Sequence, residues 1–223
     1  MTGYIDMHAH ILPGADHGST GLDMSLSQLA LAEQCGVGTV AATSHFYPDA
    51  RGSNRFVERR DQAYAALTQA YRGAVRILPG AEVLLCQGLE NHPQLDSLCI
   101  GSSRVLLTEM PPPPWPRRYE ETLLALREER GLTVLLAHVE RYPRREMEHL
   151  LDLGFYGQVN AGSLLRPLLR RRLLHMIDQG SVIALGSDVH GLSRAYQDYQ
   201  RAARRLGQGN DRLQAAMSEC LQL

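Results

Sequence analysis

The stretch TVLLAHVERYPRREMEHLLDLGFYGQV, residues 133–159, contains a strand, a helix and a second strand in immediate succession. Residues 133–137 form a short run of apolar and β-branched side chains, and residues 144–153 have the spacing of a helix with one apolar face. Gly154 follows, at a position where helices commonly end. Another short apolar run occupies residues 157–159. This order predicts two parallel strands joined by a crossover helix.

The same alternation continues along the whole chain. Seven apolar runs are expected to be strands, and they occupy residues 4–7, 39–43, 77–84, 104–108, 133–137, 157–159 and 182–186. Helical stretches alternate with them at residues 22–35, 55–71, 88–98, 118–130, 144–153, 164–179 and 193–206. Seven strand–helix units without a break in composition predict a single α/β domain over residues 1–223, folded as a closed or nearly closed barrel. A doubly wound open sheet is the alternative.

The basic residues of the chain are all arginine, because its 23 Lys+Arg residues include no lysine. This composition excludes P-loop NTPases, protein kinases and Schiff-base enzymes, which need a lysine side chain. It also excludes a dinuclear metal site that is bridged by a carboxylated lysine. The formal net charge is only −1, which gives no electrostatic basis for binding nucleic acid or an anionic membrane surface.

The cysteines are scattered, and no two of them form a C-x-x-C pair. A chain of 223 residues buries a core large enough to fold without disulfides, so a reducing compartment is expected. The sequence has no basic and apolar leader at its start, and no run approaches the roughly 18 apolar residues of a membrane span. We therefore expect a cytoplasmic protein without membrane insertion.

Residue types that bind metal ions gather where the expected strands end. His8 and His10 lie two positions apart, so a strand places both side chains on one face. The carboxyl ends of the strands in a parallel barrel meet at one mouth, where the remaining candidates are expected to converge. The full set is His8, His10, His17, His45, Glu82, Glu109, His138, Asp188 and His190, with Asp16 as a further candidate.

This set predicts a metal centre with more than one ion. Buried acids and imidazoles are costly unless cations accompany them, and nine nitrogen and oxygen donors exceed what one ion needs. We expect two or three divalent ions, chosen from Mn²⁺, Fe²⁺, Zn²⁺ and Mg²⁺, that share a carboxylate, most simply Glu82. Ions of this kind lower the pKa of bound water, which makes hydrolysis the natural reaction.

Two arginines indicate the substrate class. Arg141 follows His138 by three residues and Arg194 follows His190 by four, so both side chains can reach the mouth. Guanidinium groups suit bidentate contacts with phosphate, which favours a phosphoester substrate. No cysteine is followed six positions later by an arginine, so the C-x5-R loop of cysteine-dependent phosphatases is absent from the sequence.

Six short blocks carry a family resemblance: DMHAHILPG at residues 6–14, TSH at 43–45, GAE at 80–82, AHVERY at 137–142, NAGSLL at 160–165 and SDVH at 187–190. In this order they resemble the polymerase and histidinol phosphatase (PHP) superfamily, and most of all its CpsB-type metal-dependent tyrosine phosphatases of bacterial capsule and exopolysaccharide synthesis. The resemblance implies a distorted (β/α)7 TIM-like barrel of the PHP type with three metal ions, often manganese. It also implies attack by a metal-activated hydroxide, without a phosphoenzyme and without a cysteine nucleophile.

The resemblance further assigns residues to roles. It implies one ion held by His8, His10, Glu82 and Asp188, a second held by Glu82, Glu109 and His138, and a third held by His45, His190 and the residue at position 17. Arg141 and Arg194 would bind the phosphate and, with Asp188, form the catalytic set.

The chain departs from the family pattern in three places. His17 stands where the family has a second aspartate. The segment from His190 to Arg194 is one residue shorter than usual and continues with Ala195 instead of proline. Arg166 and Pro167 replace an expected glycine after the NAGSLL block.

The predicted function is hydrolysis of phosphotyrosine on a protein, and the expected partner is a bacterial tyrosine autokinase of capsular or exopolysaccharide synthesis. One alternative is a PHP phosphoesterase that acts on a small phosphorylated metabolite, such as histidinol phosphate or a nucleotide. Another is a catalytically weak regulatory barrel that keeps its metal ions. The segment PPPPWP at residues 111–116 is expected to be a stiff loop that shapes the mouth, with a polyproline II ligand as the alternative.

Overall fold

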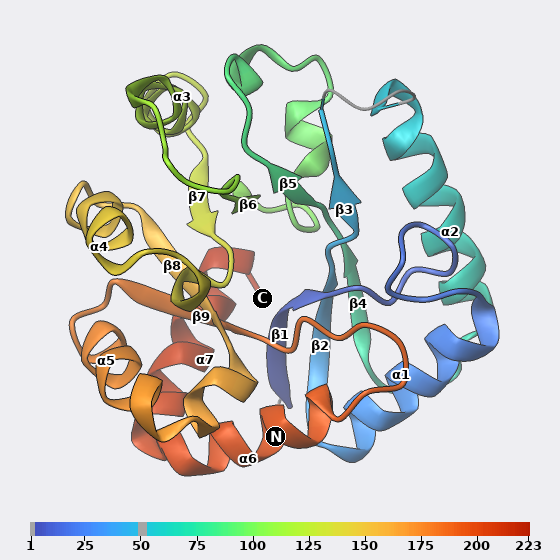
Figure 1. Cartoon of the computed structure of the whole chain (residues 1–223). Coiled ribbons are helices and arrows are strands. Elements are labelled where there is room, and N and C mark those ends of the chain that lie inside the picture. Colours follow the sequence, from blue (N-terminus) through green and yellow to red (C-terminus); the bar gives the residue numbers. More distant parts are fainter. Residues whose placement is uncertain (1–2, 49–52) are drawn as a thin grey trace.

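The computed structural model describes residues 3–48 and 53–223, and parallel strands form the centre of this part of the chain (Figure 1). The ladders run in the order β1-β2-β4 in one sheet and β3-β5-β6-β7-β8-β9 in the other, and every pair is parallel. The strands are β1 (Tyr4–Ala9), β2 (Val37–Ala42), β3 (His45–Phe46), β4 (Arg76–Pro79), β5 (Glu82–Leu84), β6 (Val105–Glu109), β7 (Thr133–Leu136), β8 (Tyr156–Asn160) and β9 (Val182–Gly186).

The two sheets form consecutive parts of the wall of one barrel. Between their ladders, the N–H of Gly80 donates to Ala42 O at 3.0 Å and the N–H of Glu82 donates to Ser44 O at 3.1 Å. Thus β3 continues the path of β2, and β5 continues that of β4. The segment that follows β9 meets the end of β1 at the parallel bridge between Ala9 and Val189. The fold is the distorted (β/α)7 TIM-like barrel that the sequence predicts.

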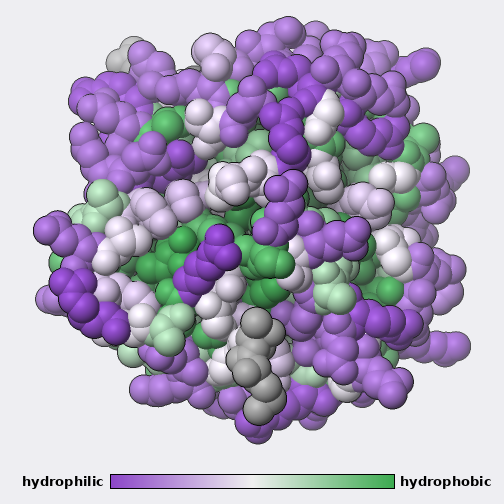
Figure 2. Space-filling view, turned by 180° about the vertical axis from the view of Figure 1, so that it is seen from behind, coloured by the Kyte–Doolittle hydropathy of each residue, from purple (hydrophilic) through white to green (hydrophobic). Residues whose placement is uncertain are grey.

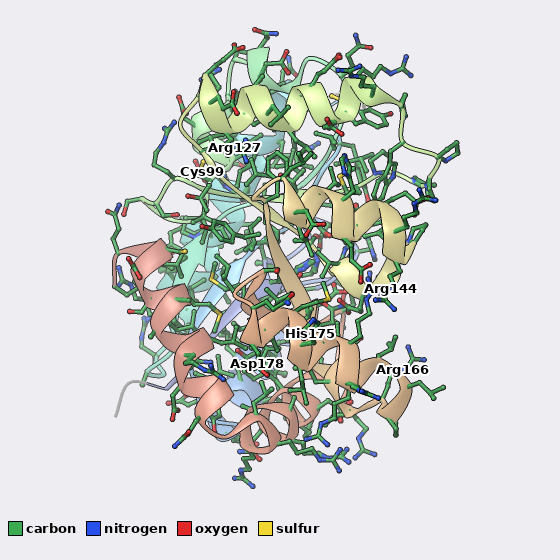
Figure 3. All side chains as sticks on the ribbon, turned by 90° about the vertical axis from the view of Figure 1, so that its left-hand side faces the viewer. Cys99, Arg127, Arg144, Arg166, His175 and Asp178 are labelled. Carbon is green, nitrogen blue, oxygen red and sulfur yellow. The ribbon has the colours of Figure 1, made fainter. Side chains whose placement is uncertain are left out.

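Helices cover the outside of the barrel (Figures 1 and 3). Pro116 and Pro143 stand immediately before α3 and α4, and Pro167 is the first residue of α5, where its fixed φ and missing N–H cost nothing. Within the described residues, no helix is both long and apolar enough to cross a membrane. The helices are α1 (Leu22–Gln34), α2 (Phe56–Ala70), α3 (Arg117–Glu128), α4 (Arg144–Asp152), α5 (Pro167–Asp178), α6 (Ala195–Leu206) and α7 (Gln208–Leu221).

Charged side chains of the outer layer differ in what they contact. Arg127 of α3 lies over the ring of Phe155, with 4.8 Å between the guanidinium carbon and the ring centroid. Arg144, at the start of α4, and Arg166, just before α5, lie toward the same edge of the view in Figure 3.

Seen from behind, the surface of the molecule has apolar residues near the middle of the face, and hydrophilic residues surround them (Figure 2).

The helix expected at residues 88–98 is wrong. The structure has two short 3₁₀ segments there, Leu89–Asn91 and Leu95–Leu98. Pro93 lies between them, and proline both lacks an N–H and disfavours a helical conformation in the residue before it. His92 accordingly is extended, with φ −65° and ψ 128°.

The last helix, α7, is absent from the sequence-based expectations. Gly207 interrupts the helical pattern with a φ of 53°, and the five residues after it, 208–212, are polar or glycine. The usable signal is the spacing of Leu213, Met217 and Leu221, which are all buried. The N–H of Leu185 in β9 lies 3.4 Å from the sulfur of Met217, so α7 packs against the last strand of the barrel.

Replacement of Met217 by alanine is expected to lower the free energy of unfolding by about 2–5 kcal/mol, because it leaves a cavity between α7 and the strands. Chemical denaturation monitored by circular dichroism measures this change. Leu168→Ala is the matched control, since that side chain is 96% exposed and its removal is expected to leave stability unchanged. Equal effects of the two substitutions would contradict the role of α7.

Candidate metal centre

The site is built from side chains that stand at the carboxyl ends of the strands. His8 lies in β1 and His10 just beyond it on the same face, and both are completely buried. His138 follows β7 and Asp188 follows β9, and their φ angles are positive, 35° and 51°. Residues other than glycine rarely adopt this left-handed conformation, and it is concentrated at functional sites.

Four donor atoms face one point between β1, β5 and the end of β9. The Nε2 atoms of His8 and His10 are 3.0 Å apart. Oε2 of Glu82 lies 3.2 Å from the first and 3.3 Å from the second. Oδ1 of Asp188 lies 3.6 Å and 3.5 Å from the same two nitrogens. The structure thus brings together the four residues expected around the first ion.

Glu82 connects this set with a second one. Its other oxygen, Oε1, lies 2.8 Å from Nε2 of His138. Oε1 of Glu109 lies 3.7 Å from the same nitrogen. Glu82 therefore presents one oxygen to each set, which is the arrangement expected of a carboxylate shared by two ions.

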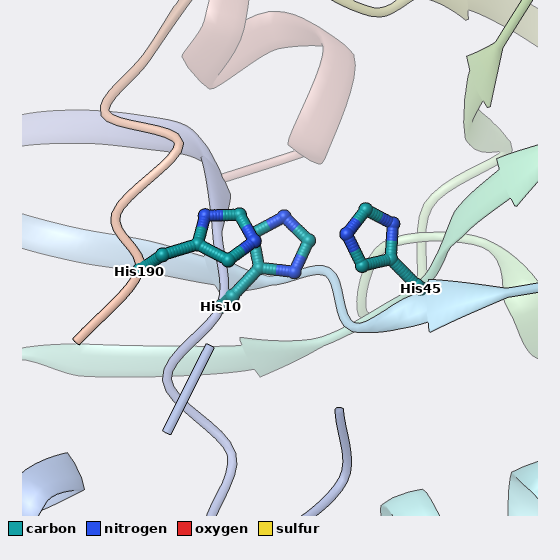
Figure 4. A group of neighbouring side chains, drawn as sticks. All are labelled: His10, His45 and His190. Carbon is teal, nitrogen blue, oxygen red and sulfur yellow. The ribbon is translucent and has the colours of Figure 1, made fainter. Parts of the chain in front are cut away.

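A third set consists of imidazoles (Figure 4). Ligand nitrogens of His10, His45 and His190 all lie within 4.8 Å of one another, and the rings come from three different segments. His17, which was expected here, is exposed, and its ring stacks on those of His45 and His190 with centroids 4.9 Å and 4.6 Å away. The group of close imidazole nitrogens therefore includes His10, whereas the ring of His17 stacks on those of His45 and His190.

Several donor atoms of these sets have no hydrogen-bond partner. Nδ1 of His45, Nε2 of His190 and Oε2 of Glu82 are buried, and none of them is hydrogen-bonded within residues 3–48 and 53–223. Nδ1 of His45 and Oε2 of Glu82 are 2.9 Å apart but not aligned for a hydrogen bond. Because an unpaired buried polar atom costs about 1–3 kcal/mol, these atoms fit divalent cations that accept nitrogen and oxygen ligands.

Hydrogen bonds on the far sides of two rings orient them toward the first set. Nδ1 of His8 contacts Oε1 of Gln158 at 3.1 Å, and Nδ1 of His10 contacts Oδ2 of Asp16 at 2.7 Å. Both oxygens accept, so each Nδ1 carries the proton and each Nε2 presents a lone pair. Two lone pairs 3.0 Å apart repel each other unless a cation or a proton lies between them.

Asp16, the further candidate ligand, is hydrogen-bonded to its neighbours. Its Oδ2 also accepts from the N–H of His45 at 2.9 Å, and its Oδ1 accepts from the N–H of Gly18 at 2.8 Å. Both oxygens are therefore already paired, and the carboxylate holds His10 and His45 from behind.

The charges of the cluster are those of a cation site. Burial alone would raise the pKa of Glu82, but contacts with His8, His10 and other imidazoles lower it well below its usual value. Burial alone would lower the pKa of His8 and His10, but nearby carboxylates outweigh it and raise both. Burial lowers the pKa of His138, which makes that ring a neutral donor. Both shifts favour the protonated form of these imidazoles beside the carboxylates.

Metal binding is expected to release protons near neutral pH, because His8 and His10 must lose those protons before their Nε2 atoms bind an ion. The affinity should therefore rise with pH. Titrating the metal-free protein with Mn²⁺ in two buffers of different ionisation enthalpy measures the protons released. Identical heats in both buffers would show that the imidazoles bind without deprotonation, contrary to this expectation.

Gln158 of β8 joins three parts of the site. Besides its contact with His8, its Oε1 accepts from the backbone N–H of His138 at 2.8 Å. Its Nε2 donates to Oδ1 of Asn160 at 3.0 Å, and Nδ2 of Asn160 donates to Oδ2 of Asp188 at 2.8 Å. One buried amide therefore fixes ligands of the first set and the backbone that carries His138.

Gln158 is not predicted from the sequence, and Asn160 is recognised there only as the first residue of the NAGSLL block. The available signal is that both alternate with the buried Val159 in one strand, so two polar side chains share an inward face. Gly186 leaves room for them, since a Cβ there would lie 2.6 Å from Nε2 of Gln158 and from Cβ of His8.

Gln158→Leu is expected to weaken Mn²⁺ binding about 10- to 100-fold, the usual effect of removing a partner that orients a metal ligand. Calorimetric titration measures the Kd. Gln62→Leu, on the exposed side of α2, serves as the control and should leave the Kd unchanged. An unaltered Kd in the Gln158 variant would show that His8 needs no support from β8.

The two predicted phosphate-binding arginines differ in their surroundings. Arg141 ends the 3₁₀ segment Val139–Arg141, and its Nη2 donates to Oδ2 of Asp188. Its side chain is 52% exposed, so the guanidinium lies between the cluster and solvent. Arg194 is exposed immediately before α6, and in the described part of the chain no hydrogen bond or ion pair of its side chain reaches the site.

Aromatic side chains border the cluster on two sides. Tyr142 lies beside His138 with ring centroids 5.7 Å apart, and Trp115 meets Tyr142 edge-on at 5.4 Å. Tyr47 stacks on His45 at 5.6 Å. Because Trp115 belongs to the PPPPWP segment, that loop contributes to the rim, as expected from the sequence.

The family model for capsular polysaccharide synthesis, CpsB/CapC, matches residues 4–215. The chain belongs to this family. Tyrosine-protein phosphatase YwqE of Bacillus subtilis (strain 168) is 27% identical to the chain over 203 residues, which cover 84% of this chain and 78% of YwqE.

Solved structures give the same picture of the fold. A chain from the crystal structures of YwqE from Bacillus subtilis and CpsB from Streptococcus pneumoniae, described as unique metal-dependent tyrosine phosphatases, superposes with a TM-score of 0.75 at 24% identity over 96% of this chain and 91% of that one. A probable 2-pyrone-4,6-dicarboxylic acid hydrolase of Acinetobacter baumannii superposes at 0.58 with 16% identity over the whole of both chains. The CpsB/CapC chain thus shares its fold with both of these structures.

Proposed function

We propose that the protein is a metal-dependent protein-tyrosine phosphatase. The observation that carries this proposal is the buried Glu82, whose two oxygens face two different sets of donors, with the guanidinium of Arg141 at their rim. Membership of the CpsB/CapC family and similarity to a relative named as a tyrosine-protein phosphatase support the substrate class.

The donor sets favour two or three divalent ions, with Mn²⁺ as the first choice and Fe²⁺, Zn²⁺ and Mg²⁺ as alternatives. Such ions, when bound, lower the pKa of water and neutralise charge on phosphoryl oxygens. We assign the first ion to His8, His10, Glu82 and Asp188, the second to Glu82, Glu109 and His138, and the third to His45, His190 and His17.

The polypeptide supplies position and charge around the phosphate. Asp188 and Asn160 anchor one side of the mouth, and Arg141 contacts Asp188 while its remaining N–H groups are open to solvent. A guanidinium in this place binds two phosphoryl oxygens and holds the ester against the cluster. Arg194 is a second phosphate ligand if its side chain turns toward the mouth.

Three of the four thiols are poorly suited to act as the nucleophile. Burial raises the pKa of Cys35 and Cys220, and it raises that of Cys99 to about 11. Nucleophilic cysteines instead have lowered pKa values, because the thiolate is the reactive form. This supports direct attack by water without a phosphoenzyme.

For the partner, we infer a protein that carries phosphotyrosine, namely a bacterial tyrosine autokinase of polysaccharide synthesis in the cytoplasm. The decisive assay offers the Mn²⁺-loaded protein a phosphotyrosyl peptide and a panel of phosphorylated metabolites, with a chelator control. Chelator-sensitive turnover that favours the peptide is expected. Preference for a metabolite would replace the substrate, and no turnover at full metal occupancy would indicate a regulatory barrel.

Arg141→Ala should leave the metal content unchanged and lower kcat/KM for the phosphotyrosyl peptide about 10- to 150-fold, which corresponds to the roughly 1.5–3 kcal/mol of a hydrogen bond to a charged group. Metal analysis and steady-state kinetics on one preparation test both parts. Arg212→Ala, an exposed arginine of α7, is the control. An unchanged kcat/KM for Arg141→Ala would remove this residue from the phosphate site.

A further inference from the structure

A row of stacked rings leads from the metal centre to the surface. The ring of His190 lies 4.6 Å from that of His17, which lies 4.9 Å from that of His45. Tyr47 continues the row at 5.6 Å from His45, with an angle of 18° between the ring planes. Tyr47 is the last ring of the row, and it is 44% exposed.

The short strand β3 explains why this tyrosine stands at the mouth. His45 and Tyr47 are two positions apart and share a face, whereas Phe46 between them points the other way into the core. Phe46 packs on Phe56 at 4.9 Å and on His92 at 5.2 Å. This anchor holds the strand, so the ring of Tyr47 is fixed beside a donor of the third set.

The other aromatic residues of the rim are held by hydrogen bonds, and Tyr47 is not. The hydroxyl of Tyr142 donates to Met110 O at 3.0 Å and accepts from Met110 N–H at 3.1 Å. Trp115 donates from Nε1 to Pro111 O at 2.7 Å. Within residues 3–48 and 53–223 no hydrogen bond holds the hydroxyl of Tyr47, and its ring contact with His45 leaves much of the side chain to solvent.

We propose that Tyr47 determines specificity by stacking on the phenyl ring of phosphotyrosine and thereby selects aryl over alkyl phosphate esters. The inference rests on the proposed function and names the part of the substrate that the rim contacts. In phosphotyrosine one oxygen joins the phosphorus to the ring, so a phosphate held at the cluster keeps the ring at its mouth. There the substrate ring extends the row of parallel rings, an arrangement that aromatic pairs favour.

Binding of two non-hydrolysable anions tests this role without requiring turnover. Phenylphosphonate and methylphosphonate carry the same acidic group and differ in the ring. Calorimetry on the Mn²⁺-loaded protein is expected to show that Tyr47→Ala weakens phenylphosphonate about three- to tenfold and leaves methylphosphonate unchanged. Tyr47→Phe keeps the ring and should bind both anions like the parent protein.

Tyr156→Ala provides the matched control, because Tyr156 is also an exposed tyrosine, at 41%, but stands at the start of β8. It should change neither Kd. Equal weakening of both anions by Tyr47→Ala, no weakening of either, or a loss in Tyr47→Phe as large as in Tyr47→Ala would overturn the inference. A protein that discriminates the two anions through Tyr47 but hydrolyses no phosphoester would overturn the proposed function alone.

Discussion

The carboxylate of Glu82 is buried where four imidazoles converge, and the rest of the site follows from the need to compensate that charge. Its oxygens lie between 2.8 and 3.3 Å from nitrogens of His8, His10, His45 and His138. A buried anion is costly unless positive charge accompanies it. The parallel barrel meets this requirement, because it brings the carboxyl ends of distant strands to one place. The metal-binding capacity is therefore a property of the topology as much as of the residues.

A spacing of two residues recurs in three segments that serve the site. It separates His8 from His10, Gln158 from Asn160, and Asp188 from His190. Precision comes from the hydrogen bonds behind the rings, since Gln158 and Asp16 each fix a protonated Nδ1.

Most of the fold and the donor set can be predicted from sequence, because both depend on local periodicity and on where apolar runs end. The failures have local causes. The expected helix at 88–98 neglects Pro93, and α7 is hidden because Gly207 interrupts an amphipathic pattern that resumes at Leu213. The role of Gln158 cannot be predicted, because a single glutamine in a strand does not reveal its hydrogen-bond partners before the structure is known. His17 shows the limit of spacing: a loop residue is expected among the donors, and its final position depends on three-dimensional packing.

The bridge between Ala9 and Val189 gives the donor cluster a second consequence. At this seam the first and last strands share only a few backbone contacts, which include the N–H of Asp188 on His8 O at 2.7 Å. The first donor set straddles the seam, with two imidazoles on one side and the carboxylate of Asp188 on the other. An ion held there would connect the two segments that meet at this bridge, so its binding energy would also contribute to closing the barrel. Removal of the ion would first weaken the contact between these two segments. The barrel would then become less rigid at the same place where its donor cluster is dispersed.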